Sequence, residues 1–412
     1  MKPSAILLIT AALHAQSFKF DFGSGKPAEG YTKVAATALY SDARGYGFEP
    51  GASIQSRDSG VTSDKPPFYF SVKVPAEGNY RVTITFGDVE TESLTTVKAE
   101  LRRLMLEKLR TEPGDFKWKT FLVNVRTPKY PGGEVRLKER EKTSEAWAWD
   151  DRLTLEFTNT RPAVSRIEIE KDDDVPTLYI AGDSTSTDQP SEPYNSWGQM
   201  LTRFFRPVIA IANHGESGES LRGFIGEGRL AKLMSVIKPG DWLFIQMGHN
   251  DQKETAADAL DTYKANLKRF IDEARRHEAA PVLITSMHRL RFDDAGKIVN
   301  TLGEYPAAVR QVAEEEEVPL IDLNAMSAEF YEALGPKDAP KAFAGSDTTH
   351  HSDYGSYELA RCIVEGIRRA DLPLVKMLTE DTPRFDPTHP DPPAEFDIPA
   401  EPTRKQERPY GQ

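Results

Sequence analysis

Cysteine is nearly absent from this sequence, because Cys362 is the only one among 412 residues. No disulfide can therefore form within one chain. Beyond the N-terminus there is also no run approaching the roughly 20 apolar residues that a transmembrane helix requires, so we expect a soluble mature protein without a membrane partner. Cys362 itself lies in an apolar helical pattern, which favours a buried small hydrophobic side chain over a reactive thiol.

An excess of basic residues is lacking as well. Lys and Arg number 52 against 64 Asp and Glu, so the formal net charge is −12 and nucleic acid is not an expected partner. The composition, 39% hydrophobic and 28% charged, is that of a globular chain. Its length allows a sizeable core and favours two domains over one.

The N-terminus has the pattern of a secretory signal. Lys2 precedes the apolar residues 5–13 and the small Ala15, which predicts a signal peptide over residues 1–15 with cleavage before Gln16. A secreted protein without disulfides suits a bacterial periplasm or the cell exterior. We therefore expect a secreted or periplasmic location.

Residues 17–170 show the alternation of antiparallel strands. Apolar and polar residues alternate over residues 18–22, 68–74, 80–86 and 153–157, with Gly, Pro and Asp between the runs. Period two with such turns predicts an antiparallel β-sandwich or jelly roll. Residues 97–109 are ambiguous, since their Leu, Glu, Lys and Arg content favours a helix while their alternation favours a strand. The alternation predicts one long strand here.

The periodicity changes at the charged run of residues 171–176, the expected linker. After it, short apolar strands alternate with helix-length amphipathic segments. The expected strands are residues 177–181, 208–213, 242–247, 281–286 and 318–323, and the clearest helices are residues 258–278 and 353–370. This alternation predicts an α/β domain over residues 177–371, with a parallel sheet covered by helices on both faces. Residues 372–412 are rich in proline and are expected to form an extended strap or a disordered end.

Four polar clusters follow successive strands or precede the last helix. They are Gly182-Asp183-Ser184, residues 213–220, Gly248-His249-Asn250-Asp251 and Asp347-Thr348-Thr349-His350. The carboxyl ends of parallel strands share one edge of the sheet, so these clusters are expected to converge there.

The converging residues fit acyl transfer by a serine, which needs a base, a carboxylate to orient that base, and donors for the oxyanion. Ser184 is the candidate nucleophile, His350 the general base and Asp347 the orienting carboxylate. The backbone amides of Ser184 and Gly218 and the side-chain amide of Asn250 are the candidate oxyanion hole. A glycine lets the backbone approach the substrate closely, and an amide donor does not change charge with pH. No metal ion or organic cofactor is expected.

Each cluster alone also has a purely structural interpretation. Gly182-Asp183-Ser184 makes ordinary turns, Asn250 can cap a helix, and Gly218 can be a turn glycine. Asp347 can cap a turn and leave His350 on the surface. Finding all four clusters in this order, each at a sheet edge, favours the catalytic interpretation.

The order Gly-Asp-Ser, a glycine block, Gly-x-Asn-Asp and Asp-x-x-His resembles the SGNH (GDSL-like) hydrolase superfamily over about residues 177–370. Within it, the motifs are most similar to those of rhamnogalacturonan acetylesterases. The resemblance implies a three-layer α/β/α sandwich and an esterase that removes acetyl groups from pectin, an acetylated plant cell-wall polysaccharide. Glu219 departs from the pattern, since such esterases typically carry arginine there. The acid leaves the glycine at 218 intact and leaves the detailed substrate contacts open.

The resemblance also implies substrate contacts beyond the motifs. His288 and Arg289 follow the fourth strand, where related esterases have similar pairs, and sugar contact or a structural salt bridge fits them equally. Asp183 is a further candidate contact.

The N-terminal domain resembles galactose-binding-like β-sandwich modules of carbohydrate enzymes through residues 20–23 and 45–48 and the strand pattern. Trp147 and Trp149 would stack on sugars if they are exposed, but core packing is favoured.

The leading functional hypothesis is a secreted O-acetylesterase acting on rhamnogalacturonan. The alternatives are an acetylesterase for xylan or another acetylated glycan, and a carbohydrate-binding protein with an inactive hydrolase domain. The presence of all four catalytic clusters argues against the inactive domain.

Overall fold

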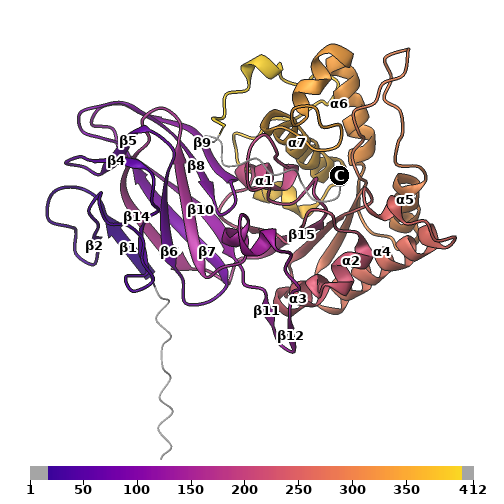
Figure 1. Cartoon of the computed structure of the whole chain (residues 1–412), viewed down its shortest axis with the longest axis horizontal. Coiled ribbons are helices and arrows are strands. Elements are labelled where there is room, and N and C mark those ends of the chain that lie inside the picture. Colours follow the sequence, from indigo (N-terminus) through magenta and orange to yellow (C-terminus); the bar gives the residue numbers. More distant parts are fainter. Residues whose placement is uncertain (1–16, 401–412) are drawn as a thin grey trace, which may run out of the picture.

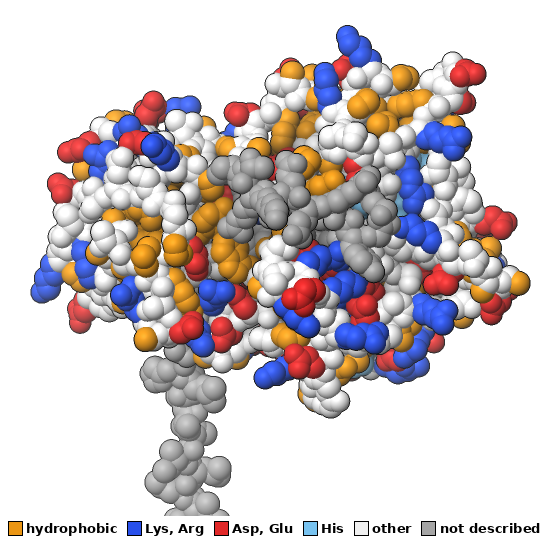
Figure 2. Space-filling model, viewed as in Figure 1, with side chains coloured by type: hydrophobic (Ala, Val, Ile, Leu, Met, Phe, Trp, Pro, Cys, Tyr) orange, Lys and Arg blue, Asp and Glu red, His pale blue; other side chains and the backbone are white. Residues whose placement is uncertain are grey.

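The computed structural model describes residues 17–400 of the chain. The expected signal peptide and residues 401–412 of the tail lie outside the described residues. Between residues 17 and 400, no helix is both long and apolar enough to cross a membrane. Acidic and basic side chains are interspersed over the face shown in Figure 2.

The N-terminal part is a sandwich of two mainly antiparallel sheets (Figure 1). The first sheet contains β10 (Lys117–Val125), β7 (Gly78–Phe86), β14 (Ala163–Lys171), β1 (Ser17–Asp21) and β2 (Thr32–Lys33), with β4 (Ser53–Ser56) and β5 (Val61–Lys65) attached. The second contains β3 (Tyr46–Phe48), β6 (Phe68–Lys73), β13 (Arg152–Thr158), β8 (Ser93–Ala99) and β9 (Arg103–Thr111). Alternate residues of each strand point inward, as Tyr80, Val82, Ile84 and Phe86 of β7 do, and form one core between the sheets.

The prediction of one long strand over residues 97–109 was wrong. The segment turns at residues 100–102, and β8 pairs antiparallel with β9. Glu100 and Arg102 have φ angles of 56° and 62°, the left-handed conformation that propensity rarely assigns to such residues. Tertiary contacts stabilise this turn, since Glu100 Oε1 accepts a hydrogen bond from the backbone N of Thr154 (3.0 Å) and Arg102 donates to the carbonyl of Tyr194 (2.8 Å).

The second part is built on a parallel sheet in the order β16 (Ala210–Asn213), β15 (Thr177–Gly182), β17 (Trp242–Gln246), β18 (Ala280–Ile284) and β19 (Leu320–Ile321). The predicted parallel sheet is confirmed. Its strand order reverses at β15, because β16 lies on one side of it and β17 on the other. In open α/β sheets such a reversal opens a crevice at the carboxyl ends of the strands, where ligands bind.

Helices cover both faces of this sheet. On one side α1 (Trp197–Leu201), α6 (Leu323–Asp338) and α7 (Asp353–Arg369) pack on Leu178 and Ile180 of β15. On the other side α2 (Leu221–Gly226), α3 (Arg229–Val236), α4 (Ala259–Arg276) and α5 (Tyr305–Glu315) share a core with Tyr179 and Ala181. Successive side chains of a strand point to opposite faces, so one strand serves both cores and a three-layer α/β/α sandwich results (Figure 1).

As far as it is described, the tail packs along α7. After a 3₁₀ turn at Pro373–Met377 it runs extended along α7, and Leu378, Phe385 and Ile398 are buried in the core that α7 shares. Arg368 of α7 donates to the carbonyl of Thr382 (2.8 Å). Cys362 of the same helix is fully buried, as the apolar pattern predicted.

The sandwich and the α/β part share buried contacts. The turn after β8 and the start of β9 lie against the α/β part. Leu104 of β9 joins the hydrophobic core of α1 and α7, and Gln199 of α1 donates to the carbonyl of Leu101 in the turn (2.6 Å). Arg103, 2% exposed, pairs with the buried carboxylate of Asp188 (2.7 Å). These contacts hold the sandwich against the segment that follows β15.

Candidate active site

The structure brings Ser184, His350 and Asp347 together at the carboxyl edge of the parallel sheet. His350 Nε2 lies 2.7 Å from Ser184 Oγ, and His350 Nδ1 lies 3.0 Å from Asp347 Oδ2. All three side chains are at most 4% exposed. This is the geometry in which an imidazole can take the serine proton while a carboxylate holds its other nitrogen.

A tight turn after β15 presents Ser184. Glycine fits closely at position 182, because a β-carbon there would lie 1.9 Å from Ser186 Oγ and 3.0 Å from the carbonyl oxygen of Gln246. The Asp183 carboxylate closes the turn by accepting hydrogen bonds from the backbone N (2.9 Å) and the hydroxyl (2.7 Å) of Thr185.

The sequence predicts Asp183 as a substrate contact, but the structure corrects this, because its side chain is 0% exposed and is bound within the turn by Thr185. Burial alone would raise the pKa of Asp183, but the nearby His249, with Nδ1 at 3.4 Å, and the Thr185 hydrogen bonds lower it below its ordinary value. The residue acts as a buried carboxylate that fixes the turn.

Asp347 is held as an anion by its own loop. Its Oδ1 accepts hydrogen bonds from the backbone N of Thr349 (2.7 Å) and of His350 (3.0 Å). Burial raises the pKa of Asp347, but the His350 side chain and these backbone donors outweigh burial and lower the pKa below its ordinary value. The Asp-x-x-His spacing thus produces a compact loop in which the carboxylate and the imidazole meet.

His351, the neighbouring histidine, has a different environment. It is fully buried, its Nε2 lies 2.7 Å from the hydroxyl of Tyr331, and its ring packs on Phe343. Burial, together with the charge of His350, lowers the pKa of His351 to about 3. This neutral ring is part of the core, so the loop presents only His350 to Ser184.

Hydrogen bonds connect the segments that carry the candidate oxyanion donors to the turn that carries Ser184. Gln189 Nε2 donates to the carbonyl of Ser184 (2.6 Å) and reaches the hydroxyl of Ser217 at 3.4 Å. Asn250 Nδ2 donates to the carbonyl of Glu219 (3.0 Å). Gly218 between them has a φ of +79°, which favours glycine. These bonds link the Ser184 turn, the glycine block and Asn250.

Two cations from the sandwich side bind the glycine block, Gly218-Glu219-Ser220, and the residue before it. The carbonyl oxygen of Ser217 accepts hydrogen bonds from Lys138 Nζ (2.8 Å) and from Arg140 Nη2 (2.6 Å). In a trans peptide the N–H points opposite to the C=O, so the amide of Gly218 is directed away from these cations. The Lys138 ammonium also pairs with the buried carboxylate of Glu219. Glu219, which stands where an arginine is typical, is therefore engaged by the sandwich side.

The chain matches known hydrolases over this region. A model of the GDSL-like Lipase/Acylhydrolase family matches residues 180–357. The rhamnogalacturonan acetylesterase RhgT of Bacillus subtilis (strain 168) is 40% identical over 212 residues, which cover 48% of this chain and 91% of RhgT. The chain belongs to the GDSL-like lipase/acylhydrolase family. It is accordingly a carboxylic ester hydrolase.

Other relatives of this GDSL-like hydrolase extend the comparison. Residues 18–106 match a model described as Beta-agarase/YXIM esterase-like, galactose-binding domain-like. The uncharacterized esterase YxiM of Bacillus subtilis is 28% identical over 377 residues, covering 87% of this chain and 92% of YxiM, so that alignment includes both parts. An acetylxylan esterase of Geobacillus stearothermophilus is 27% identical over 168 residues, covering 39% of this chain and 72% of that protein.

The other predicted substrate contacts of the hydrolase have different surroundings. Arg289 is half-buried and donates to the hydroxyl of Thr349 (3.2 Å) and the carbonyl of His249 (3.3 Å), so it lies beside the loop of Asp347 and His350. His288 is 7% exposed, and its backbone N donates to the hydroxyl of Ser327. Between residues 17 and 400 neither side chain forms an ion pair with a carboxylate, so the structure does not contain the salt bridge proposed as their alternative role.

The aromatic residues near the site include one that the sequence did not indicate. Tyr194 lies edge-on to the His350 ring, with centroids 6.1 Å apart, and is half-buried. Trp149 is buried and Trp147 packs on Tyr69, so core packing holds for both. On the sandwich, Trp118 is 73% exposed on β10 and is the better candidate for stacking on a sugar.

Among residues 17–400, no group of three His, Cys, Asp or Glu side chains has an arrangement that could hold a metal ion.

Proposed function

We propose that this GDSL-like hydrolase is a carbohydrate O-acetylesterase that removes acetyl groups from rhamnogalacturonan. The proposal rests on one observation above all, the hydrogen-bonded chain from Ser184 through His350 to Asp347. The 40% identity to RhgT, which spans nearly all of that rhamnogalacturonan acetylesterase, supports the substrate.

In the proposed mechanism, Ser184 Oγ attacks the acetyl carbonyl carbon as His350 Nε2 takes the hydroxyl proton. The carbonyl oxygen becomes an oxyanion, which the amides of Ser184 and Gly218 and the Asn250 side chain stabilise. The imidazolium formed on His350 is stabilised by the anionic carboxylate of Asp347.

Collapse of the tetrahedral intermediate breaks the ester C–O bond. His350 returns its proton to the sugar oxygen, which leaves as an alcohol, and an acetyl-serine remains. Water, deprotonated by the same imidazole, then attacks the acetyl carbon. The second collapse releases acetate, and the proton on His350 returns to Ser184 Oγ.

The test is acetate release by the full chain from acetylated rhamnogalacturonan and from acetylated xylan, each measured beside Ser184→Ala. We expect faster release from rhamnogalacturonan, and none above background in the variant. Preference for xylan would favour the alternative substrate, which the similarity to an acetylxylan esterase motivates. Binding of polymer without acetate release by the wild-type chain would instead favour a carbohydrate-binding protein.

We further propose that the protein is exported, on the strength of the signal pattern over residues 1–15. Cell fractionation with N-terminal sequencing tests this. A mature chain beginning at Gln16 outside the cytoplasm is expected, and an intact Met1 in the cytoplasmic fraction would contradict it.

A further inference from the structure

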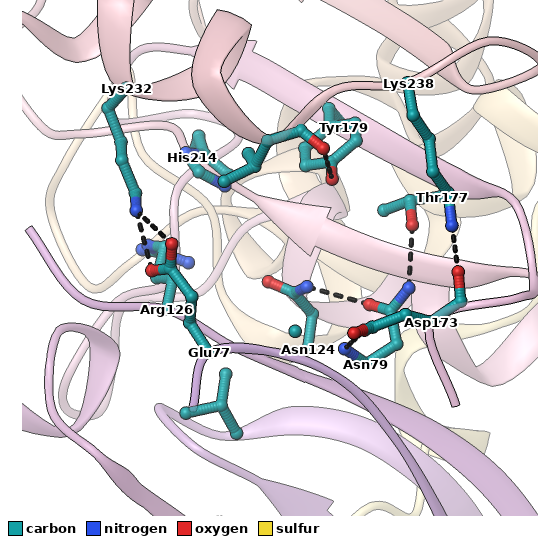
Figure 3. A pocket seen from close by; sticks show the side chains of 13 residues that line it. Glu77, Asn79, Asn124, Arg126, Asp173, Thr177, Tyr179, His214, Lys232 and Lys238 are labelled. Carbon is teal, nitrogen blue, oxygen red and sulfur yellow. Dashed lines mark hydrogen bonds and ion pairs between the residues drawn. The ribbon is translucent and has the colours of Figure 1, made fainter. Parts of the chain in front are cut away.

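A pocket of about 310 Å³ lies between the sandwich and the α/β part (Figure 3). Ser184, His350 and Asp347 are not among the residues that line it. Asn79, Asn124 and Arg126 line it from the sandwich, and Thr177, His214 and Lys232 line it from the α/β part. Its volume is at the lower end of the range for small-molecule sites, roughly 300–1,000 Å³.

Arg126 is the unusual residue of this pocket. It is only 5% exposed, and its guanidinium stacks on Trp149 with 4.4 Å to the ring centroid. Within residues 17–400, its Nε and Nη1 atoms are buried and have no hydrogen-bond acceptor. Burial, followed by the charge of Arg103, lowers the pKa of Arg126 to about 10. A buried cation without an acceptor is costly unless something else supplies one.

Three neighbouring cations, Lys232, Arg229 and Arg103, already have carboxylate partners, and Lys238 donates to the backbone carbonyl of Asp173. Lys232 pairs with both oxygens of Glu77 (2.8 and 2.6 Å), and Figure 3 shows this pair at one side of the pocket. Arg229 pairs with both oxygens of Glu141 (2.9 and 2.6 Å), and Arg103 with Asp188.

The carboxylates that raise the pKa of Arg126 through their charge are Asp188, Glu141 and Glu100. The first two hold the cations just named, and Glu100 accepts from the backbone of Thr154. Within residues 17–400 these acids therefore provide no hydrogen bond to Nε or Nη1 of Arg126.

Uncharged hydrogen-bonding groups line the same pocket. Asn124 Nδ2 donates to Asn79 Oδ1 (2.8 Å), and Asn79 Nδ2 donates to Thr177 Oγ1 (2.8 Å), a chain that Figure 3 shows across the pocket. Asn124 Oδ1 is buried and has no donor within the described residues. Burial and the charge of Arg126 lower the pKa of His214 well below its ordinary value, so it lines the pocket as a neutral imidazole.

We propose that this pocket binds a small hydroxylated carboxylate of the sugar-acid class. The carboxylate would accept from Arg126, and a hydroxyl group would donate to Asn124 Oδ1, so one ligand satisfies both unpartnered groups. Binding would join the two parts of the chain, because the groups that line the pocket come from both. The site does not depend on which ester the catalytic residues hydrolyse.

Calorimetric titration of the full chain with galacturonate, galactose and acetate tests the proposal, because galactose lacks the carboxylate and acetate lacks the hydroxyls. Galacturonate is expected to bind at least tenfold more tightly than either. Arg126→Met should weaken galacturonate binding at least tenfold while the melting temperature is unchanged or higher, since a buried unpaired charge is removed. The matched control, Arg289→Met beside the candidate active site, should leave this binding unchanged.

Lys238→Glu provides a second variant in case Arg126→Met does not fold. Lys238 is half-buried and also lines the pocket, and the reversed charge should weaken galacturonate binding several-fold. The proposal would be overturned if galactose or acetate bound as tightly as galacturonate, or if Arg289→Met lost galacturonate binding. It would also be overturned if both Lys238→Glu and Arg126→Met kept full binding. No measurable binding of galacturonate would overturn it as well.

Discussion

The hydrogen bonds from Lys138 and Arg140 to the Ser217 carbonyl lead to a specific kinetic prediction. Lys138→Met removes the ammonium that donates to the Ser217 carbonyl and keeps most of the aliphatic stem. Arg140 remains as the other donor to that oxygen, at 2.6 Å. The peptide that carries the Gly218 N–H then has one anchor instead of two.

The magnitude follows from the role of that amide. Removing a whole oxyanion donor lowers kcat by about 10²–10³. Lys138→Met leaves the donor in place but less fixed, so we expect a loss of about tenfold, or about 1.4 kcal/mol of transition-state stabilisation. Lys138→Met with Arg140→Met should lose about a hundredfold. KM for a small ester should change little, because the contact is made mainly in the transition state.

The assay is steady-state hydrolysis of 4-nitrophenyl acetate. Lys138→Arg should restore most of kcat, because it returns a cationic donor, and Lys142→Met, an exposed lysine on the same segment, should behave as wild type. Lys138 also neutralises the buried Glu219, so melting is followed in parallel and rates are compared well below the transition. A folded Lys138→Met protein with unchanged kcat, or with a change in KM alone, would refute the reasoning.

Three further predictions concern the catalytic loops. Ser184→Ala should lower kcat by about three orders of magnitude or more while the free energy of unfolding in urea changes by less than about 1 kcal/mol; more than a tenth of the activity left would rule out Ser184 as the nucleophile. His350→Ala should abolish nearly all esterase activity, whereas folded His351→Ala should keep most of it, and the reverse order would reassign the base. Because the pKa of His351 falls from 6.5 to about 3 on folding, the unfolded state binds more protons between these values and stability falls as pH drops through that window. From this group alone, the free energy of unfolding should be about 2 kcal/mol lower at pH 5 than at pH 7. His351→Leu should reduce this pH dependence by the same amount. If the free energy of unfolding of His351→Leu changed with pH as much as that of the wild type, the buried neutral ring would be contradicted.

The sequence alone was sufficient to predict the parallel sheet and the positions of the candidate catalytic residues along the chain. Both depend on local pattern: short apolar runs specify buried strands, and polar residues directly after such strands must lie at one edge of a parallel sheet. The spacing of Asp347 and His350 likewise closes a loop within four residues, so their contact needs no distant partner.

Only the tertiary structure decided what surrounds these residues. Glu100 and Arg102 take left-handed conformations because the other domain and β13 bind their side chains, and no local propensity encodes that turn. Asp183 faces the protein interior rather than the substrate, since Thr185 and His249 engage it. Glu219 meets Lys138 from a segment 81 residues away, and Arg126 lies in a pocket whose walls come from both parts of the chain. Such pairings depend on how two folded units dock, and the periodicity that specifies strands and helices contains no record of which charged side chains will then face each other.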